Sequence, residues 1–213
     1  MNIIHSEKLI WILAERTGTR AIGQLLNFWD VEVRFQGYPE ILPKNYNDGE
    51  FSQQYRHDWY GDWEVPDYPF VITMRNPYSR ILSYYKSLHL KLDCQGEECQ
   101  YTFSEFLDKV LIGQNRYTSL QHEKLFKERD VKHVVKLESM KIDLMNIPMI
   151  EKKFKESQEF RDTWKRVISD NKFTKESEDN DSKITESDAE IIYDVFQDQF
   201  NMFGYSKDSW RYL

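Results

Sequence analysis

The chain has 213 residues, of which 40% are hydrophobic and 15% aromatic, and its 29 basic and 36 acidic residues give a net charge of -7. This length and composition fit one globular domain with a sizeable core, so we expect residues 1–213 to form a single domain. No run of Lys and Arg would make a basic patch, and we therefore expect no nucleic-acid partner. A few well-placed cations can still bind an anionic ligand.

No apolar run reaches the roughly 20 residues that span a bilayer, so we expect no membrane span. The N-terminal residues hold one short apolar stretch, which we interpret as a core strand and not as a signal peptide, and we therefore expect a cytoplasmic protein. Cys94 and Cys99, in CQGEEC, fit either two free thiols or a local disulfide. A metal site would need further Cys or His ligands, and no such pair is near them in the sequence.

Strands and helices alternate along the first half of the chain. Residues 8–14 form a continuous apolar run of strand length, which is typical of a parallel sheet buried on both faces. Residues 20–29 place apolar side chains at helical spacing, and residues 31–35 alternate in the manner of a second strand. Residues 37–69 predict irregular structure with short elements at most. Residues 70–74 (FVITM) then predict a strongly buried strand.

The second half continues the alternation. After the strand at 70–74, Pro77 stands at the first position of a helix with Asn76 as its N-cap, and this helix reaches about Leu88. Further elements are expected in chain order: a helix at 103–111, a strand at 131–137, a helix near 140–145, a break at Pro148, a helix at 151–168 and a charged mobile loop at 172–183.

The last helix has the clearest signals. Thr185 and Asp188 have the spacing of a capping box, and Gly204 is placed to end the helix in the left-handed conformation. Its apolar stripe comprises Ala189, Ile192, Val195, Phe196, Phe200 and Phe203. Alternating strands and helices predict an α/β fold of P-loop-like, three-layer type, with a central, mostly parallel sheet flanked by helices.

The first candidate site is the turn that follows the strand at 8–14, in LIWILAERTGTR. Ligands of parallel α/β sheets bind at the carboxyl ends of the strands, where Arg16 supplies a charge and Thr17 and Thr19 supply hydroxyl donors. Gly18 lets the backbone approach a ligand, and the N-terminus of the following helix favours an anion. The Walker A pattern GxxxxGK[ST] is absent. An ordinary turn with a surface arginine is the alternative.

The second candidate site follows the strand at 70–74, where the spacing is R-x-P-x-x-R-x-x-S-x-Y. Asn76, Arg80 and Ser83 fall on one face of the predicted helix, and Arg75 ends the strand. Arginine binds phosphate oxygens in a bidentate manner, so this face suits a phosphate group. A solvated polar face is the alternative. Two such junctions in one small chain indicate a ligand with two anionic ends.

These motifs resemble those of the sulfotransferases that use 3′-phosphoadenosine 5′-phosphosulfate (PAPS), especially the carbohydrate type. The 5′-phosphosulfate loop of that family reads [KR]TG[TS], similar to residues 16–19, and its 3′-phosphate motif is matched at every fixed position of Arg75 to Tyr85. Residues 133–144 and 193–205 resemble its later strand-plus-helix and its terminal helix ending in F-G-Y. The resemblance covers most of the chain. Most relatives have lysine at the position of Arg16, and Golgi relatives have a membrane anchor and a longer chain.

The resemblance implies in-line transfer of a sulfuryl group from PAPS to an acceptor hydroxyl, with a carbohydrate as the expected acceptor, 3′,5′-adenosine bisphosphate as the product and no metal required. Arg16 and the loop N–H groups would stabilise charge on the transferring group, and Arg75 and Ser83 would bind the 3′-phosphate. The donor-binding residues expected on this basis are Arg16, Thr17, Gly18, Thr19, Arg20, Arg75, Arg80 and Ser83.

An acceptor hydroxyl needs a general base, and His57, in QYRHDWYGDW, is the first candidate because related carbohydrate sulfotransferases place a histidine in this region. A neutral imidazole has a suitable pKa for that role. Glu40 is the second candidate, since some relatives use an upstream glutamate. A packed or surface histidine is the alternative for His57.

Two other functions fit the same pattern. The first is a P-loop-type nucleotide or small-molecule kinase, which would share the α/β fold, but the GK[ST] sequence of such kinases is missing from this chain. The second is a non-catalytic nucleotide-binding protein, which would keep the nucleotide pocket without a general base. Binding of ATP with Mg²⁺, compared with binding of 3′,5′-adenosine bisphosphate, separates the kinase from the sulfotransferase.

Overall fold

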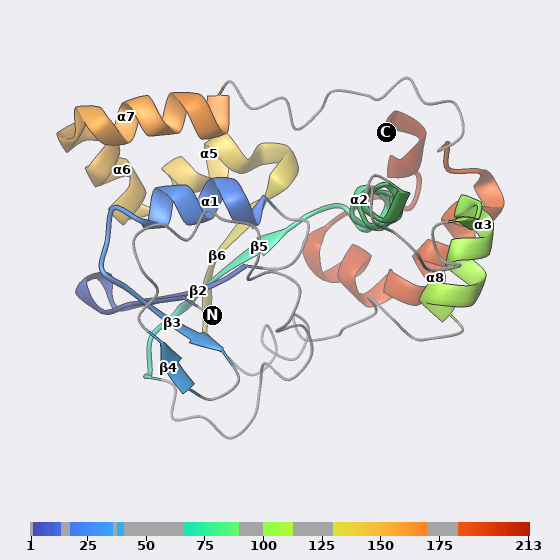
Figure 1. Cartoon of the computed structure of the whole chain (residues 1–213), viewed down its shortest axis with the longest axis horizontal. Helices are drawn as coiled ribbons and strands as arrows, with labels where there is room; N and C mark the ends of the chain where they lie inside the picture. Colours follow the sequence, from blue (N-terminus) through green and yellow to red (C-terminus); the bar gives the residue numbers. More distant parts are fainter. Residues whose placement is uncertain are drawn as a thin grey trace. The chain divides into compact units, whose positions relative to one another are not determined.

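A computed structural model describes residues 2–13, 18–35, 38–40, 66–89, 100–112, 130–169 and 183–213. The chain divides into two compact units (Figure 1). The first unit comprises Met1–Met74 and Glu128–Phe173, and the second comprises Arg75–Lys127 and Thr174–Leu213. The boundary therefore falls between the strand at 70–74 and the helix that follows it. That all 213 residues act as a single domain stays a prediction.

The first unit is built on a six-stranded sheet with the order β4-β3-β1-β2-β5-β6. Its strands are β1 (Asn2–Ile4), β2 (Leu9–Ile12), β3 (Val31–Phe35), β4 (Tyr38–Glu40), β5 (Phe70–Met74) and β6 (Val131–Lys136). The strands β2, β5 and β6 are parallel, whereas β1 pairs antiparallel with both β2 and β3, and β3 pairs antiparallel with β4. The α/β fold predicted from the sequence is confirmed, and its sheet is mixed.

The antiparallel part of the sheet comes from two short strands that the sequence did not predict. A 3₁₀ turn at His5–Glu7 joins β1 to β2, and Lys8 closes this hairpin with a left-handed φ of 51°. The second, β4, lies within the segment expected to hold short elements at most, and it pairs with the end of β3. Each strand has three residues, which is too short for an alternating pattern to be recognised.

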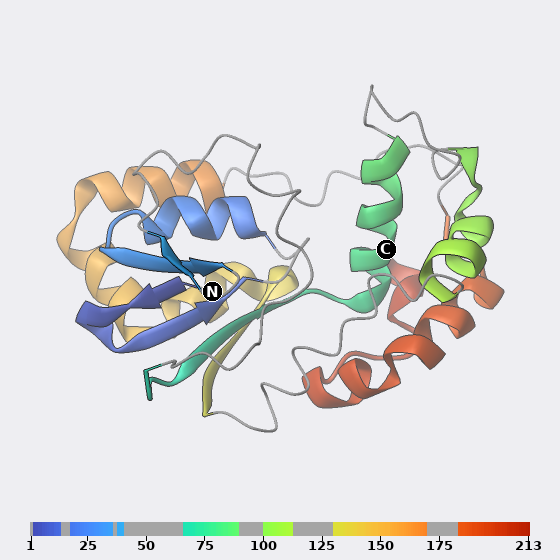
Figure 2. The ribbon, with the colours of Figure 1, turned by 60° about the horizontal axis from the view of Figure 1, so that its bottom comes forward.

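Helices cover one face of this sheet (Figures 1 and 2). They are α1 (Thr19–Leu26), α5 (Met140–Met145), α6 (Pro148–Glu156) and α7 (Gln158–Trp164). Trp11, Val71 and Val135 of neighbouring strands join the core formed with these helices. On the opposite face, Ile10 and Ile72 are also fully buried. The central strands are thus buried on both faces, as their continuous apolar sequence predicted.

The helix predicted at 151–168 is divided in the structure. It begins earlier, with Pro148 at its first position, and α6 ends at Glu156 because Ser157 adopts an extended conformation and caps α7. The Ser157 hydroxyl accepts a hydrogen bond from the Phe160 N–H at 3.2 Å. Arg161 donates to the carbonyl oxygens of Phe154 and Lys155, which are among the last of α6. The single helix predicted here is therefore two helices, because Ser157 caps the start of α7 and Arg161 binds carbonyl oxygens at the end of α6.

The second unit is helical. It comprises α2 (Pro77–His89), α3 (Phe103–Phe106) with its π-helical continuation Leu107–Ile112, α8 (Glu186–Phe203) and a 3₁₀ turn at Ser209–Tyr212. The predicted capping box of Thr185 and Asp188 is confirmed, and a second one joins Thr102 and Glu105. Asp188 is buried and also accepts a hydrogen bond from the Ser104 hydroxyl at 2.7 Å, which ties the start of α8 to α3.

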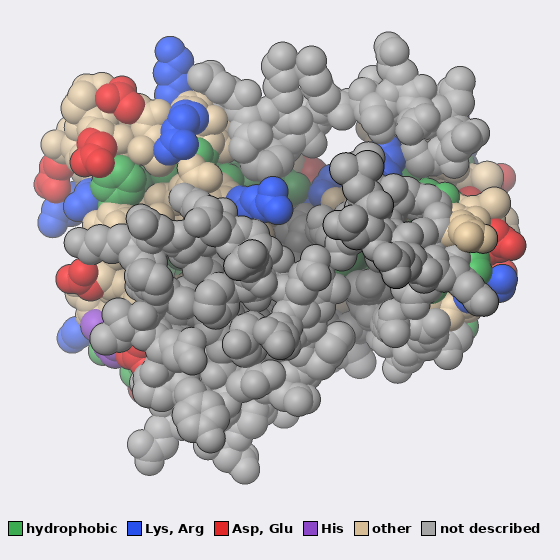
Figure 3. Space-filling view, in the orientation of Figure 1, with side chains coloured by type: hydrophobic (Ala, Val, Ile, Leu, Met, Phe, Trp, Pro, Cys, Tyr) green, Lys and Arg blue, Asp and Glu red, His purple; other side chains and the backbone are tan. Residues whose placement is uncertain are grey.

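The apolar stripe of α8 forms much of the core of the second unit. Ala189, Ile192, Phe196, Phe200 and Phe203 are buried as predicted, and Val195 is half-buried. Gly204 ends the helix with a φ of 66°, which confirms the predicted left-handed cap. No helix in the described ranges is long and apolar enough to cross a membrane. Figure 3 shows basic and acidic side chains interspersed over the described helices of the first unit.

Candidate functional site

The two predicted anion-binding junctions begin from neighbouring strands. β2 and β5 are adjacent and parallel, with Ile12 in register with Ile72, so their carboxyl ends lie at the same edge of the sheet. The buried Thr73 hydroxyl donates a hydrogen bond to the Ile12 carbonyl oxygen at 3.2 Å and ties the two strand ends together. This edge is where ligands of parallel α/β sheets bind.

The first junction is described from Gly18 onward, and Arg16 and Thr17 lie outside the described residues. Gly18 is the N-cap of α1 with a φ of 81°, and no side chain among the described residues caps this helix. Thr19 is half-buried and Arg20 is exposed. A helix whose first N–H groups lack a capping side chain can offer them to an anion.

Gly18 is also pressed against the turn that follows β6. A Cβ atom added to it would lie 2.7 Å from the Met140 terminal methyl and 3.0 Å from a Leu137 methyl. That turn is held by Asp143, whose carboxylate accepts hydrogen bonds from the Lys136 N–H at 2.8 Å and the Ser139 hydroxyl at 2.6 Å. The segment that resembles the family's later strand-plus-helix thus packs directly beneath the first junction.

The second junction begins with the helix cap that the sequence predicted. Asn76 is 4% exposed, and its Oδ1 accepts a hydrogen bond from the Tyr78 N–H at 3.0 Å. Pro77 is the first residue of α2. On the core side of this helix, Ile81 and Tyr85 are buried. The Tyr85 hydroxyl donates to the Tyr101 carbonyl oxygen at 3.0 Å, so the last residue of the motif has a packing role.

The predicted polar face of α2 is largely enclosed. Arg80 is 4% exposed, and its guanidinium carbon lies 5.0 Å from the centre of the Phe196 ring. Arg75 and Ser83 are half-buried. A solvated face is therefore not what the structure shows at Asn76 and Arg80. The cation–π contact gives Arg80 a packing partner, and its role in donor binding stays a prediction.

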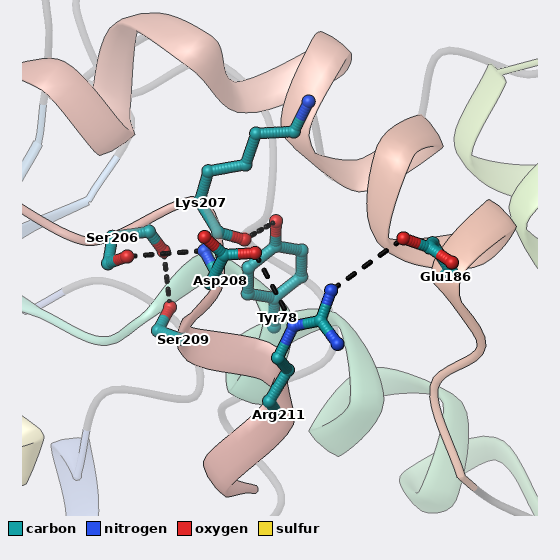
Figure 4. Close-up of polar contacts among 7 residues, drawn as sticks. All are labelled: Tyr78, Glu186, Ser206, Lys207, Asp208, Ser209 and Arg211. Atoms are coloured by element: carbon teal, nitrogen blue, oxygen red, sulfur yellow. Dashed lines mark hydrogen bonds and ion pairs between the residues drawn. The ribbon is translucent and has the colours of Figure 1, made fainter.

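The segment after α8 packs on the start of α2, and sequence reasoning missed this contact. The Tyr78 hydroxyl donates to the Lys207 carbonyl oxygen at 2.7 Å (Figure 4). Asn76 Nδ2 donates to the Ser209 hydroxyl at 2.7 Å. Burial, with smaller effects from Asp208 and Tyr193, raises the pKa of Tyr78 to about 12. The signal in the sequence was limited to Gly204, which shows where the helix ends but not where the chain goes next.

Charged side chains fasten the same segment on its outer side. Arg211 lies 3.4 Å from the Asp208 carboxylate and 3.6 Å from the Glu186 carboxylate (Figure 4). Its guanidinium carbon also lies 4.7 Å from the centre of the Trp210 ring. Exposed ion pairs of this kind contribute roughly 0–1 kcal/mol each, so the partly buried hydrogen bonds to α2 are the stronger restraint.

The two candidate bases differ in what the structure describes. Glu40 ends β4, an edge strand three positions away from β2 in the sheet, which separates their backbones by about 14 Å. His57 lies outside the described residues, as do Cys94, Cys99 and the charged loop up to residue 182. Within the described ranges no cluster of His, Cys, Asp or Glu could hold a metal ion.

Comparisons with known proteins returned no match: no family model, no curated protein and no solved structure is significantly similar to this chain.

Proposed function

We propose that the protein is a PAPS-dependent sulfotransferase that transfers a sulfuryl group to an acceptor hydroxyl, with a carbohydrate as the acceptor class. One observation carries the proposal. The two anion-binding sequences start from the adjacent carboxyl ends of β2 and β5. A donor with a phosphosulfate at one end and a 3′-phosphate at the other matches two cationic junctions that begin side by side.

Two sets of residues bind the two anionic ends of the donor. Arg16, Thr17, Gly18, Thr19 and Arg20 surround the 5′-phosphosulfate, where the start of α1, which no described side chain caps, adds N–H donors. Arg75 and Ser83 bind the 3′-phosphate, and Arg80 supports the same helix from its position over Phe196. Each preorganised donor aimed at developing charge is typically worth about 10²–10³ in rate.

The reaction is an in-line displacement at sulfur. The acceptor oxygen forms a bond to sulfur while the bond between sulfur and the 5′-phosphate oxygen breaks, and that oxygen leaves with the electron pair. The acceptor proton passes to His57, and 3′,5′-adenosine bisphosphate is the product. Positioning and charge stabilisation supply most of the rate, as they do in phosphoryl transfer.

Calorimetry on the full chain tests the donor class. We expect 3′,5′-adenosine bisphosphate to bind more tightly than 5′-AMP, and more tightly than ATP with Mg²⁺. Tighter binding of ATP with Mg²⁺ would instead favour the kinase. Transfer of radiolabelled sulfate from PAPS to a panel of glycans and phenols then tests the activity, and donor binding without transfer to any acceptor would leave a nucleotide-binding protein.

A further inference from the structure

A chain of three hydrogen bonds fixes the N-cap of α2. The Ser209 hydroxyl donates to the Ser206 carbonyl oxygen at 2.6 Å and accepts from Asn76 Nδ2 at 2.7 Å. With its nitrogen held by Ser209, the Asn76 amide turns its oxygen toward the Tyr78 N–H, to which it bonds at 3.0 Å. A residue 133 positions away therefore sets the orientation of the cap.

A second contact holds the same turn of the helix. The Tyr78 hydroxyl donates to the Lys207 carbonyl oxygen, one residue beyond Ser206 (Figure 4). The centre of the Tyr78 ring also lies 4.8 Å from the centre of the Phe200 ring of α8. The segment Ser206–Ser209 thus bonds to both Asn76 and Tyr78. Because these residues flank Pro77, the segment contacts the chain on both sides of the point where it passes from Arg75 into α2.

We propose that Ser209 is a positioning residue for the 3′-phosphate of the donor. By fixing Asn76 it fixes the first turn of α2, and with it the position of Arg75 relative to Ser83 two turns further on. This inference rests on the proposed function, in which Arg75 and Ser83 bind that phosphate. Ser209 itself touches no substrate in this scheme and acts through Asn76.

Substitution of Ser209 by Ala removes the hydrogen bond that Asn76 Nδ2 donates to the Ser209 hydroxyl, and so weakens the restraint on the orientation of the amide. We expect the dissociation constant for 3′,5′-adenosine bisphosphate to rise about tenfold, the equivalent of one hydrogen bond. The dissociation constant for 5′-AMP, which has no 3′-phosphate, stays unchanged. Ser209→Thr keeps the hydroxyl and restores the preference.

Ser206→Ala is the matched control. Among the described residues, the Ser206 hydroxyl accepts a hydrogen bond from the Asp208 N–H, whereas the Ser206 backbone oxygen, which accepts from Ser209, is unchanged by the substitution. This variant should bind both nucleotides as the unmodified chain does. If Ser209→Ala does not fold, Ser209→Cys keeps the side-chain volume with a much weaker hydrogen bond, and it should lose part of the preference.

The outcomes separate this inference from the proposed function. If the unmodified chain does not distinguish 3′,5′-adenosine bisphosphate from 5′-AMP, the proposed function fails and the inference fails with it. If the chain makes the distinction and Ser209→Ala makes it equally well, only the inference is overturned. A Ser209→Ala variant that weakens both nucleotides to the same degree would show a general effect on the fold, and this also overturns the inference.

Discussion

Gly18 meets two requirements that no other residue type satisfies together. Its φ of 81° lies in the left-handed region, which costs a residue with a Cβ about 1–2 kcal/mol. Its Cα also faces the turn after β6, where Met140 and Leu137 leave no room for a methyl group. The glycine that the sequence singled out for approach to a ligand is therefore needed for packing as well.

Gly18→Ala should lower the free energy of unfolding by about 1–3 kcal/mol, measured by urea denaturation. Gly204→Ala is the control, because Gly204 has a similar φ of 66° but nothing within 4 Å of an added Cβ. It should show the conformational cost alone. Equal losses in the two variants would mean that Met140 and Leu137 move aside without cost, and that Gly18 is there for its conformation only.

The candidate bases can be separated by a substitution pair. His57→Ala should lower kcat about 10²–10⁴-fold, the usual contribution of general base catalysis. Glu40→Ala should leave kcat nearly unchanged, since β4 holds the Glu40 backbone three strands away from β2. Steady-state sulfuryl transfer from PAPS measures both. A normal kcat in His57→Ala with a large loss in Glu40→Ala would reverse the assignment.

At the scale of the element, α8 combines a strong apolar stripe with one buried amide. Gln199 is fully buried beside Phe196 and Phe200, and neither its Nε2 nor its Oε1 has a hydrogen-bond partner in the part of the chain that the structure describes. An unpaired buried polar group costs about 1–3 kcal/mol. The helix is thus less stable in its core than its apolar pattern alone would suggest.

Gln199→Met, which keeps the shape and removes the polar atoms, should raise the free energy of unfolding by about 1–3 kcal/mol in urea denaturation. Gln197→Met, at an exposed position two residues earlier on the same helix, is the control and should change it little. A loss of stability in Gln199→Met would show that the amide has a partner, such as an ordered water, that the substitution removes.

At the scale of the whole molecule, each unit has its own hydrophobic core, and each contains a group whose pKa is shifted. In the first unit, desolvation, with a smaller effect from Lys132, lowers the pKa of His133 below its usual value. In the second, burial raises the pKa of Tyr78 to about 12. The two shifts limit stability from opposite ends of the pH scale.

Below about pH 6.5 the unfolded chain binds a proton at His133 more readily than the folded chain, so stability should fall with decreasing pH. Between about pH 10 and 12 the unfolded chain loses the Tyr78 proton first, so stability should fall with increasing pH. Urea denaturation across pH, with His133→Gln and Tyr78→Phe, measures each effect. An unchanged acid slope in His133→Gln, or an unchanged alkaline slope in Tyr78→Phe, would contradict the corresponding assignment.

The sequence by itself determined the features that depend on nearby residues. The α/β class, the strands β2 and β5, the Asn76 and Thr185 caps and the end of α8 at Gly204 all follow from interactions within a few positions. Periodicity and capping are local, so a single sequence contains them. Arg16, Thr17 and His57 lie outside the described residues, and their roles stay predictions.

Only the tertiary structure decided which residues remote in the sequence contact one another. The pairing of β1 between β2 and β3, the burial of Arg80 against Phe196 and the bond between Asn76 and Ser209 all join residues remote in the sequence. No local pattern specifies such pairs, because they depend on how whole elements pack and on which polar groups are then left to satisfy. The cap at Asn76 was therefore predictable, but the residue that orients it was not.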